Sequence, residues 1–318
     1  MARYRHSLPQ FNGGAFLSDG GMETDLIFNR GVDLPLFASF PLVETEAGRK
    51  YLVDYYESFL RIARDRQTGF ILDSATWRSN PDWGAQLGYD AKALDRVNRE
   101  AIELIAGLRA TWETSVTPIV LNGAIGPRGD GYKAGRMAAA EAEEYHAAQI
   151  ASFARTDADM VSAITMNTIF EAVGIARAAK EAKLPCVVSF TVETDGRLVG
   201  GQSLKEAVET TDEATGGSPA YYMVNCAHPS HFDQAFGRGE AWVKRIFGVR
   251  ANASAKSHQE LDESPTIDIG DMADLSRRYT ALQGAIPKLS VYGGCCGTDH
   301  RHIAMISEAV LPPAKLSA

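Results

Sequence analysis

The feature that most constrains the fold is an alternation of short apolar runs with longer amphipathic segments along the whole chain. The runs contain about 4–8 apolar residues, many of them β-branched or aromatic, as is typical of buried parallel strands. The eight runs are AFLSD (15–19), GFILD (69–73), VTPIVLNGA (116–124), DMVSAIT (159–165), PCVVSFT (185–191), AYYMVNC (220–226), RIFGVRANA (245–253) and LSVYGGCC (289–296).

The segments between the runs have apolar residues at three- and four-residue spacing, which predicts amphipathic helices. These segments are 48–66, 91–112, 138–156, 170–183, 203–212, 228–239, 271–284 and 298–310. Thr298 is the expected N-cap of the last helix, and Gly284 is expected to end the helix before it in a left-handed conformation.

Eight alternations of strand and helix predict a (β/α)₈ TIM barrel. A doubly wound open sheet is the alternative, because the periodicity does not show whether a sheet closes on itself. Barrels of about this length often form one domain, and no Pro-, Ser- or Gly-rich linker interrupts the chain. We therefore expect a single barrel domain over residues 1–318.

The charge balance argues against a polyanionic partner. The 32 basic and 40 acidic residues give a net charge of −8, whereas nucleic-acid binders usually carry a basic face. No stretch approaches the roughly 18 consecutive apolar residues of a membrane helix, and the first residues lack the apolar region of a secretory signal. We expect a cytoplasmic protein that acts on small molecules, without nucleic-acid or membrane partners; its oligomeric state stays open.

Catalytic residues of TIM barrels lie at the C-terminal ends of the strands, so the residues that close each run are the candidate site. Cys226 closes the sixth run, and Cys295 and Cys296 close the eighth, whereas Cys186 lies inside an apolar run and is an expected core residue. Thiols of a cytoplasmic protein are expected to stay reduced. Three thiolates at one rim of the barrel, with a fourth position open, are the pattern of a catalytic Zn²⁺ site.

Adjacent cysteines on a regular strand point to opposite faces of the sheet. Cys295 and Cys296 can therefore reach one metal ion only if the strand ends there in an irregular turn. Gly293, Gly294 and Gly297 surround the pair and are expected to supply the backbone freedom for that turn.

Histidines offer a competing interpretation, a zinc hydrolase with mixed cysteine and histidine ligands. His228 follows Cys226, and His300 and His302 follow the cysteine pair. Because residues two apart on a helix do not share a face, His300 and His302 are expected not to bind one metal ion together. The sequence also lacks the HExxH, GxSxG, P-loop and GxGxxG motifs.

Five sequence blocks resemble, in their order and spacing, the homocysteine S-methyltransferase family of zinc-dependent TIM barrels. They are LSDGGMETDL (17–26), NGAIGPRGDGY (122–132), VVSFTVETDGRLVGGQSLKEAV (187–208), VNC (224–226) and GGCCGT (293–298). The resemblance implies that Cys226, Cys295 and Cys296 bind Zn²⁺ and that the acceptor's thiol fills the open position. No catalytic residue beyond the metal site is then required.

By the same resemblance, the protein transfers a methyl group from a small sulfonium or quaternary ammonium donor, such as S-methylmethionine, to homocysteine. The product is methionine, which places the reaction in methionine biosynthesis. The donor's identity stays open. Two alternatives remain, the same zinc chemistry on a different thiol and a zinc-binding barrel without transferase activity.

The resemblance also implies substrate contacts. Asp19, Gly20 and Gly21 are expected to hold the amino-acid end of the acceptor, and Thr76 and Trp77 follow the second strand. The indole of Trp77 would suit a cationic donor. The family usually has a glutamate after the fourth strand for the acceptor's ammonium group, and we place Asn167 there. This substitution motivates the alternative of a different thiol acceptor, unless Glu171 compensates.

Overall fold

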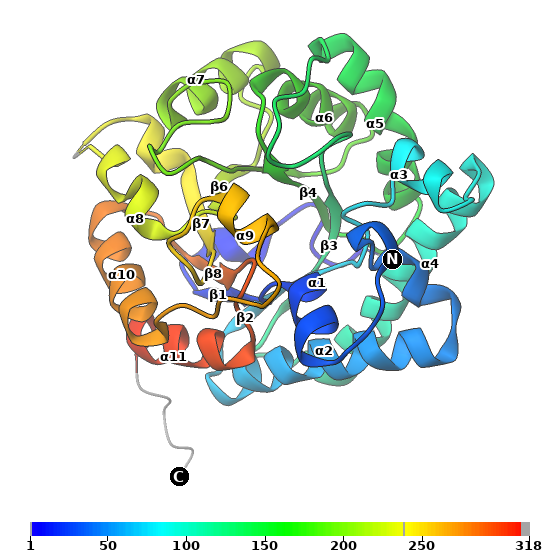
Figure 1. The fold of residues 1–318 in the computed structure, drawn as a ribbon, viewed down its shortest axis with the longest axis horizontal. Coiled ribbons are helices and arrows are strands. Elements are labelled where there is room, and N and C mark those ends of the chain that lie inside the picture. Colours follow the sequence, from blue (N-terminus) through cyan, green and yellow to red (C-terminus); the bar gives the residue numbers. More distant parts are fainter. Residues whose placement is uncertain (1, 238, 313–318) are drawn as a thin grey trace.

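The computed structural model describes residues 2–237 and 239–312 and shows a closed barrel of eight parallel strands (Figure 1). Each strand pairs with the next along the chain, and the pairing of β8 with β1 closes the ring. The strands are β1 (Phe16–Ser18), β2 (Gly69–Asp73), β3 (Ile119–Ile125), β4 (Met160–Met166), β5 (Cys186–Phe190), β6 (Tyr221–Asn225), β7 (Ile246–Ala251) and β8 (Val291–Gly294). The predicted barrel is confirmed, and the open sheet is excluded.

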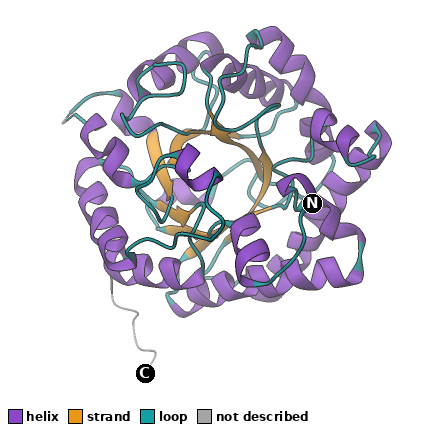
Figure 2. Cartoon of the chain, in the orientation of Figure 1, coloured by secondary structure: helices purple, strands orange, loops and turns teal. Residues whose placement is uncertain are grey.

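Long helices form a ring around the strands (Figure 2). They are α2 (Glu46–Asp65), α4 (Ala91–Trp112), α5 (Ala139–Ala154), α6 (Ile169–Glu181), α7 (Leu204–Thr215), α10 (Met272–Ala285) and α11 (His300–Val310). Shorter helices are α1 (Met22–Thr24), α3 (Pro81–Gln86), α8 (Pro229–Phe232) and α9 (His258–Asp262). The predicted helix 228–239 is thus reduced to α8 and the 3₁₀ turn η5 (Asp233–Ala235), and Gly237 and Gly239 follow that turn.

Two predicted helix ends lie elsewhere. Asp299, not Thr298, caps α11, because its carboxylate accepts a hydrogen bond from the Arg301 N–H at 2.9 Å. The Thr298 hydroxyl instead donates to the Cys295 carbonyl at 2.7 Å. Helix α10 runs through Gly284 and ends before Ile286, which is extended.

The apolar core has two layers, one between the strands and the helices and one inside the barrel. The inner layer includes Phe16, Ile71, Val120, Met160, Val187, Tyr221, Met223 and Val291. The 3₁₀ turn η1 (Pro9–Asn12) contributes the buried Gln10, whose amide donates to the Tyr221 hydroxyl at 3.3 Å. Since the N-terminal segment packs against this inner layer, a ligand reaches the barrel at the opposite, C-terminal end of the strands.

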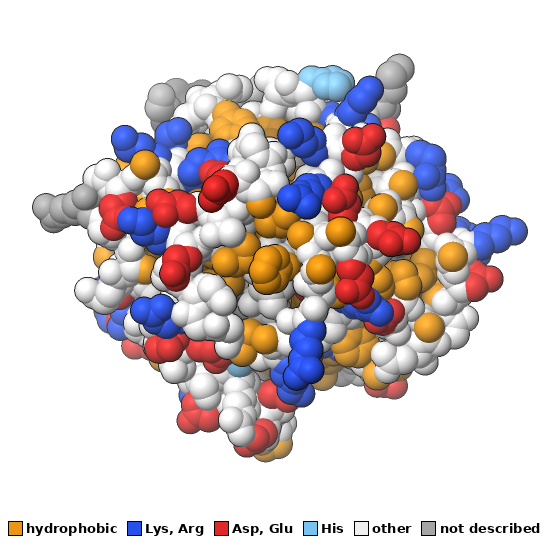
Figure 3. Space-filling model, turned by 90° about the horizontal axis from the view of Figure 1, so that it is seen from above, with side chains coloured by type: hydrophobic (Ala, Val, Ile, Leu, Met, Phe, Trp, Pro, Cys, Tyr) orange, Lys and Arg blue, Asp and Glu red, His pale blue; other side chains and the backbone are white. Residues whose placement is uncertain are grey.

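The surface carries both signs of charge. On the side shown in Figure 3, basic and acidic side chains are interspersed. Within residues 2–237 and 239–312, none of the helices combines the length and the apolar character that crossing a membrane requires.

Candidate functional site

The three cysteines predicted from the strand ends meet at the mouth of the barrel. Cys226 follows β6, and Cys295 and Cys296 follow β8, with their Sγ atoms all within 4.8 Å of one another. In the described part of the chain they are the one such cluster of metal-ligating side chains. Cys186 lies buried in β5 with a pKa raised to about 12 by burial, in keeping with its expected place in the core.

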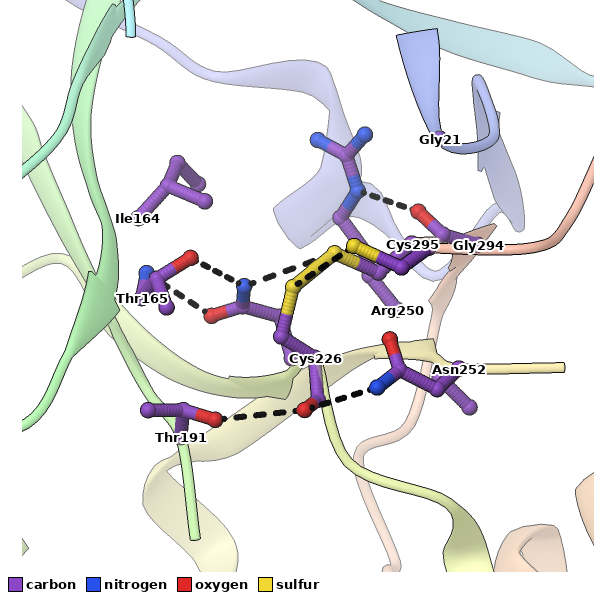
Figure 4. The surroundings of a disulfide bond; sticks show 12 residues. Gly21, Ile164, Thr165, Thr191, Cys226, Arg250, Asn252, Gly294 and Cys295 are labelled. Atoms are coloured by element: carbon purple, nitrogen blue, oxygen red, sulfur yellow. Dashed lines mark hydrogen bonds between the residues drawn. A yellow bond between two sulfur atoms is a disulfide. The ribbon is translucent and has the colours of Figure 1, made fainter. Parts of the chain in front are cut away.

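Two of these cysteines are bonded to each other. Cys226 and Cys295 form a disulfide (Figure 4). The free Cys296 Sγ lies 4.0 Å from that of Cys226. The expectation that all thiols are reduced is therefore wrong for this structure. The Cα–Cα distance of 5.3 Å between Cys226 and Cys295 falls in the usual range for disulfides. Cysteines placed to bind one metal ion are thus also close enough to form a disulfide. Metal binding by all three sulfurs requires prior reduction, since the ligands are thiolates.

The sulfur cluster fits a zinc ion in size and in donor chemistry. Sulfurs about 2.3 Å from a tetrahedral zinc ion lie about 3.8 Å from one another. The 4.0 Å between Cys226 and Cys296 is close to that spacing. Cys226, Cys295 and Cys296 therefore suit a soft metal with one coordination position left open.

Backbone contacts hold Cys226 in an unusual conformation. Its φ of 52° is left-handed, a region that costs energy for any residue with a Cβ. Its carbonyl accepts hydrogen bonds from Asn252 Nδ2 at 3.0 Å, from Thr191 Oγ1 at 3.3 Å and from His258 Nε2 (Figure 4 shows the first two). These bonds stabilise the turn that directs the sulfur toward β8.

Glycine is required at the positions around the cysteine pair for two different reasons. Gly297 has a φ of 79°, so it supplies the backbone freedom that the sequence suggested. Gly293 and Gly294 lie in β8, where a Cβ would overlap the Ser18 hydroxyl and the Thr298 hydroxyl, respectively. For these two the requirement is close packing, not conformational freedom.

A buried arginine lines the same cavity as the cysteines. The Arg250 guanidinium forms ion pairs with Asp19 and Asp73, and its Nε donates to the Gly294 carbonyl at 3.2 Å. Asp19 also accepts a hydrogen bond from the Tyr55 hydroxyl at 3.1 Å. Burial raises the pKa of Asp19 to about 7, although Arg250 opposes the shift. The Asp19 carboxylate is thus already paired inside the protein.

The cavity above the cysteines has a volume of about 80 Å³, room for on the order of five to eight water molecules and hence for a small ligand. Of the predicted substrate contacts, Asp19, Gly20, Gly21 and Trp77 line it. The Gly21 N–H donates a hydrogen bond to the Thr298 carbonyl at 3.1 Å. The Trp77 indole donates to the Ile164 carbonyl at 3.2 Å.

Two predicted contacts lie outside this lining. The fully buried Thr76 donates its hydroxyl to the Ala124 carbonyl at 2.8 Å. The Asn167 amide donates to the carbonyls of Asp130 and Lys133 at 3.0 and 2.9 Å, so it anchors the loop after β3. The strand periodicity placed both near the rim, but the side chains turn away from the cavity.

At the end of β4 the cavity is lined by Ile164 and Thr165. Both are uncharged, so this strand offers no counter-charge for an ammonium group. Glu171 does not compensate, because it is absent from the lining and accepts bonds from the Arg128 N–H at 2.6 Å and from His146 at 2.9 Å.

Two lining residues escaped the sequence interpretation, although both belong to the blocks that carry the resemblance. Glu23 follows the double glycine after β1, and burial raises its pKa while the Ser39 hydroxyl opposes the shift. The Tyr132 ring packs against His258 in a tilted arrangement with ring centroids 4.2 Å apart, and its hydroxyl lies 3.9 Å from Cys296 Sγ. An acidic residue so close after the first strand was the signal that could have identified Glu23.

The histidines proposed as competing ligands do not join the cysteine cluster. The Nδ1 of His302 lies 3.1 Å from the Asp299 carboxylate, and its Nε2 lies 2.9 Å from the Ile269 carbonyl. His228 lies 2.7 Å from the Ser230 hydroxyl, and burial lowers its pKa to about 4.

Comparison with known proteins gives a consistent picture. The family model described as homocysteine S-methyltransferase matches residues 16–310. No curated protein matches the sequence significantly. Among solved structures, the oxidized form of the homocysteine methyltransferase MmuM from Escherichia coli has a TM-score of 0.76 at 17% identity, covering 96% of this chain and 99% of that one. Its metallated form has a TM-score of 0.73 at 19% identity, with the same coverage.

Proposed function

Because the chain belongs to the homocysteine S-methyltransferase family, we propose that this methyltransferase transfers a methyl group from a sulfonium or quaternary ammonium donor to homocysteine, giving methionine. S-methylmethionine is the donor that we propose to test first. The observation that carries the proposal is the convergence of three sulfurs within 4.8 Å at the mouth of a closed barrel.

We assign the zinc ligands to Cys226, Cys295 and Cys296. Bound zinc would lower the pKa of the acceptor's thiol, so that its sulfur is a thiolate at neutral pH. The three cysteine thiolates together carry more negative charge than the ion neutralises, which favours an electron-rich acceptor sulfur. No general base from the protein is then needed at this step.

The other cavity residues position the substrates and exclude water. Asp19 and Asp73 each form an ion pair with Arg250, so these three buried charges are paired within the protein. Trp77 and Tyr132 line the walls with aromatic surface, which suits a cationic methyl donor. Direct transfer requires the methyl carbon to lie in line between the donor's leaving atom and the acceptor sulfur.

Removal of one proposed ligand tests the zinc assignment. In reduced protein, Cys295→Ser should lower zinc content well below one ion per chain and reduce methyl transfer by at least about 100-fold, because the loss of a residue that only supports a metal ligand already costs about 10- to 100-fold. Cys186→Ser, outside the cavity, is the matched control and should retain zinc. Elemental analysis and methionine formation from homocysteine and S-methylmethionine are the measurements. A Cys295→Ser protein with full zinc and full activity would disprove the assignment.

The neutral residues Ile164 and Thr165 favour one second candidate, the same chemistry on a thiol without an ammonium group. Methyl transfer to such a thiol in preference to homocysteine would identify this activity. A zinc-loaded protein that consumes no donor with any thiol would instead be a binding barrel without transferase activity.

A further inference from the structure

The cavity contains three carboxylates and one arginine, and their pairing is uneven. Asp19 and Asp73 both form ion pairs with Arg250. Glu23 lines the same cavity, and among the described residues no Lys, Arg or His nitrogen lies within 4.0 Å of its carboxylate. Its side-chain donor is the Ser39 hydroxyl, at 2.8 Å from Oε1. Among the described residues, Glu23 is therefore the carboxylate of the cavity lining that forms no ion pair.

The nearest cations do not neutralise this charge by contact. Arg78 and Arg250 attract the Glu23 carboxylate only at longer range. The Arg78 guanidinium lies over the rings of Trp83 and Trp77, at 4.1 and 5.1 Å from their centroids. A partly buried carboxylate without a cationic partner is unfavourable, so a cation that enters the cavity gains a strong interaction there.

Glu23 also lines the same cavity as the cysteine sulfurs. Glu23 lies in α1, directly after the Gly20–Gly21 turn, and it lines one cavity with Cys295 and Cys296. The residues that face the cavity from β4, Ile164 and Thr165, are uncharged. Of the three carboxylates that line the cavity, Glu23 is thus the one that forms no ion pair among the described residues and can bind a cationic group of a substrate.

We propose that Glu23 is the specificity-determining carboxylate that binds the cationic group of a substrate. This group is the ammonium of an amino-acid thiol or the charged centre of the methyl donor, which share the same chemistry. The assignment rests on the proposed function, since it takes the cavity to be the place where acceptor and donor meet.

Glu23→Gln tests the proposal, because it keeps the size and the Ser39 contact but removes the charge. Reduced, zinc-loaded protein is titrated calorimetrically with homocysteine and with 4-sulfanylbutanoate, which has the same thiol and carboxylate but no ammonium. If Glu23 binds the acceptor, the substitution weakens homocysteine binding by about 10- to 100-fold and leaves 4-sulfanylbutanoate unchanged. A purely structural role would weaken both thiols equally, and that result overturns the proposal.

A second arm titrates S-methylmethionine without any acceptor. Weakening of this ligand alone, with homocysteine unaffected, assigns Glu23 to the donor's cationic group. Unchanged affinity for both cationic ligands overturns the proposal. Glu44→Gln is the control, because Glu44 is an exposed carboxylate near in sequence whose partners Arg96 and Tyr89 lie outside the cavity lining.

A rescue variant and the wild-type protein complete the test. In Glu23→Gln/Ile164→Glu, a carboxylate returns to the cavity from β4, and homocysteine affinity should recover at least partly. Wild-type protein that transfers methyl groups while Glu23→Gln behaves identically refutes the Glu23 assignment alone. Wild-type protein that binds zinc but methylates no thiol refutes the proposed function itself.

Discussion

At the scale of single residues, Arg250 pairs two buried carboxylates in the barrel interior. It is 8% exposed and lies between Asp19 and Asp73, whose charges would otherwise repel each other in a buried site. The carboxylates in turn raise the pKa of Arg250 above its ordinary value, although burial alone would lower it. Asp19 is therefore already paired with Arg250, whereas Glu23 forms no ion pair among the described residues and is the carboxylate that we propose binds a substrate cation.

Replacement of Arg250 should therefore destabilise the protein strongly. Arg250→Met leaves two buried carboxylates unpaired and is expected to lower the free energy of unfolding by about 3–5 kcal/mol. Chemical denaturation of the reduced protein measures this change. The triple variant Arg250→Met/Asp19→Asn/Asp73→Asn should recover part of the loss, whereas no recovery would show that the charges are not the cause.

At the scale of elements, the helix that follows the cysteine pair depends on its first residues. Asp299 caps α11 and pairs with Arg301 and His302. Burial alone would raise the pKa of Asp299, but the bonds from His302 and Arg301 outweigh it and hold the pKa well below its ordinary value. The end of β8, the cysteines and the start of α11 thus form one short connected unit.

Loss of this cap should affect stability in a pH-dependent way. Asp299→Ala is expected to cost about 0.5–2 kcal/mol near neutral pH. Because the folded-state pKa is depressed, the ionised carboxylate stabilises the fold above the unfolded-state pKa of about 3.9, and this stabilisation is lost as the pH falls below it. Asp299→Asn, which keeps a capping side chain, should retain much of the stability but lose that acid-range dependence. Denaturation curves between pH 3 and 7 distinguish the two variants, and identical pH profiles for all three proteins would contradict the assignment.

For the whole molecule, the barrel is asymmetric along its axis. The N-terminal segment packs against the inner core at one end, with Leu8 and Gln10 buried. Arg5 ties this segment to the chain before β4 through the Ala154, Thr156 and Ala158 carbonyls. The cysteine cluster and its cavity lie at the other end, so stability and ligand binding are separated in space.

Removal of residues 1–12 should lower the stability of the barrel without affecting metal binding at its other end. Loss of the Leu8 burial, about 2 kcal/mol, and of the Arg5 hydrogen bonds, about 1 kcal/mol each, is expected to lower the denaturation midpoint clearly. Zinc stoichiometry of the folded, reduced protein should stay the same. A truncated protein that is folded but has lost its zinc would show that the two ends of the barrel are coupled.

Periodicity was sufficient for the eight alternations of strand and helix, because the strands are buried on both faces and the helices on one. Closure of the sheet is shown by the pairing of β8 with β1. Helix α4 has the predicted bounds, and β2 coincides with the run 69–73. The three cysteines could be placed for the same reason, since the parallel strands of a barrel all end at one rim. The helix after β6 was less predictable, because α8 and η5 are set by local glycines and by packing more than by an apolar period.

The sequence by itself determined the architecture, the family and the three sulfur ligands that we propose, because these follow from repeated patterns and from motif order. Only the tertiary structure decided which rim side chains face the cavity. Asn167 turns to the loop after β3, Thr76 to Ala124, and Ile164 takes the wall position at β4. Side-chain direction at an irregular strand end depends on backbone angles, such as the φ of 64° at Thr165, and on long-range partners such as Arg250, which strand periodicity does not encode.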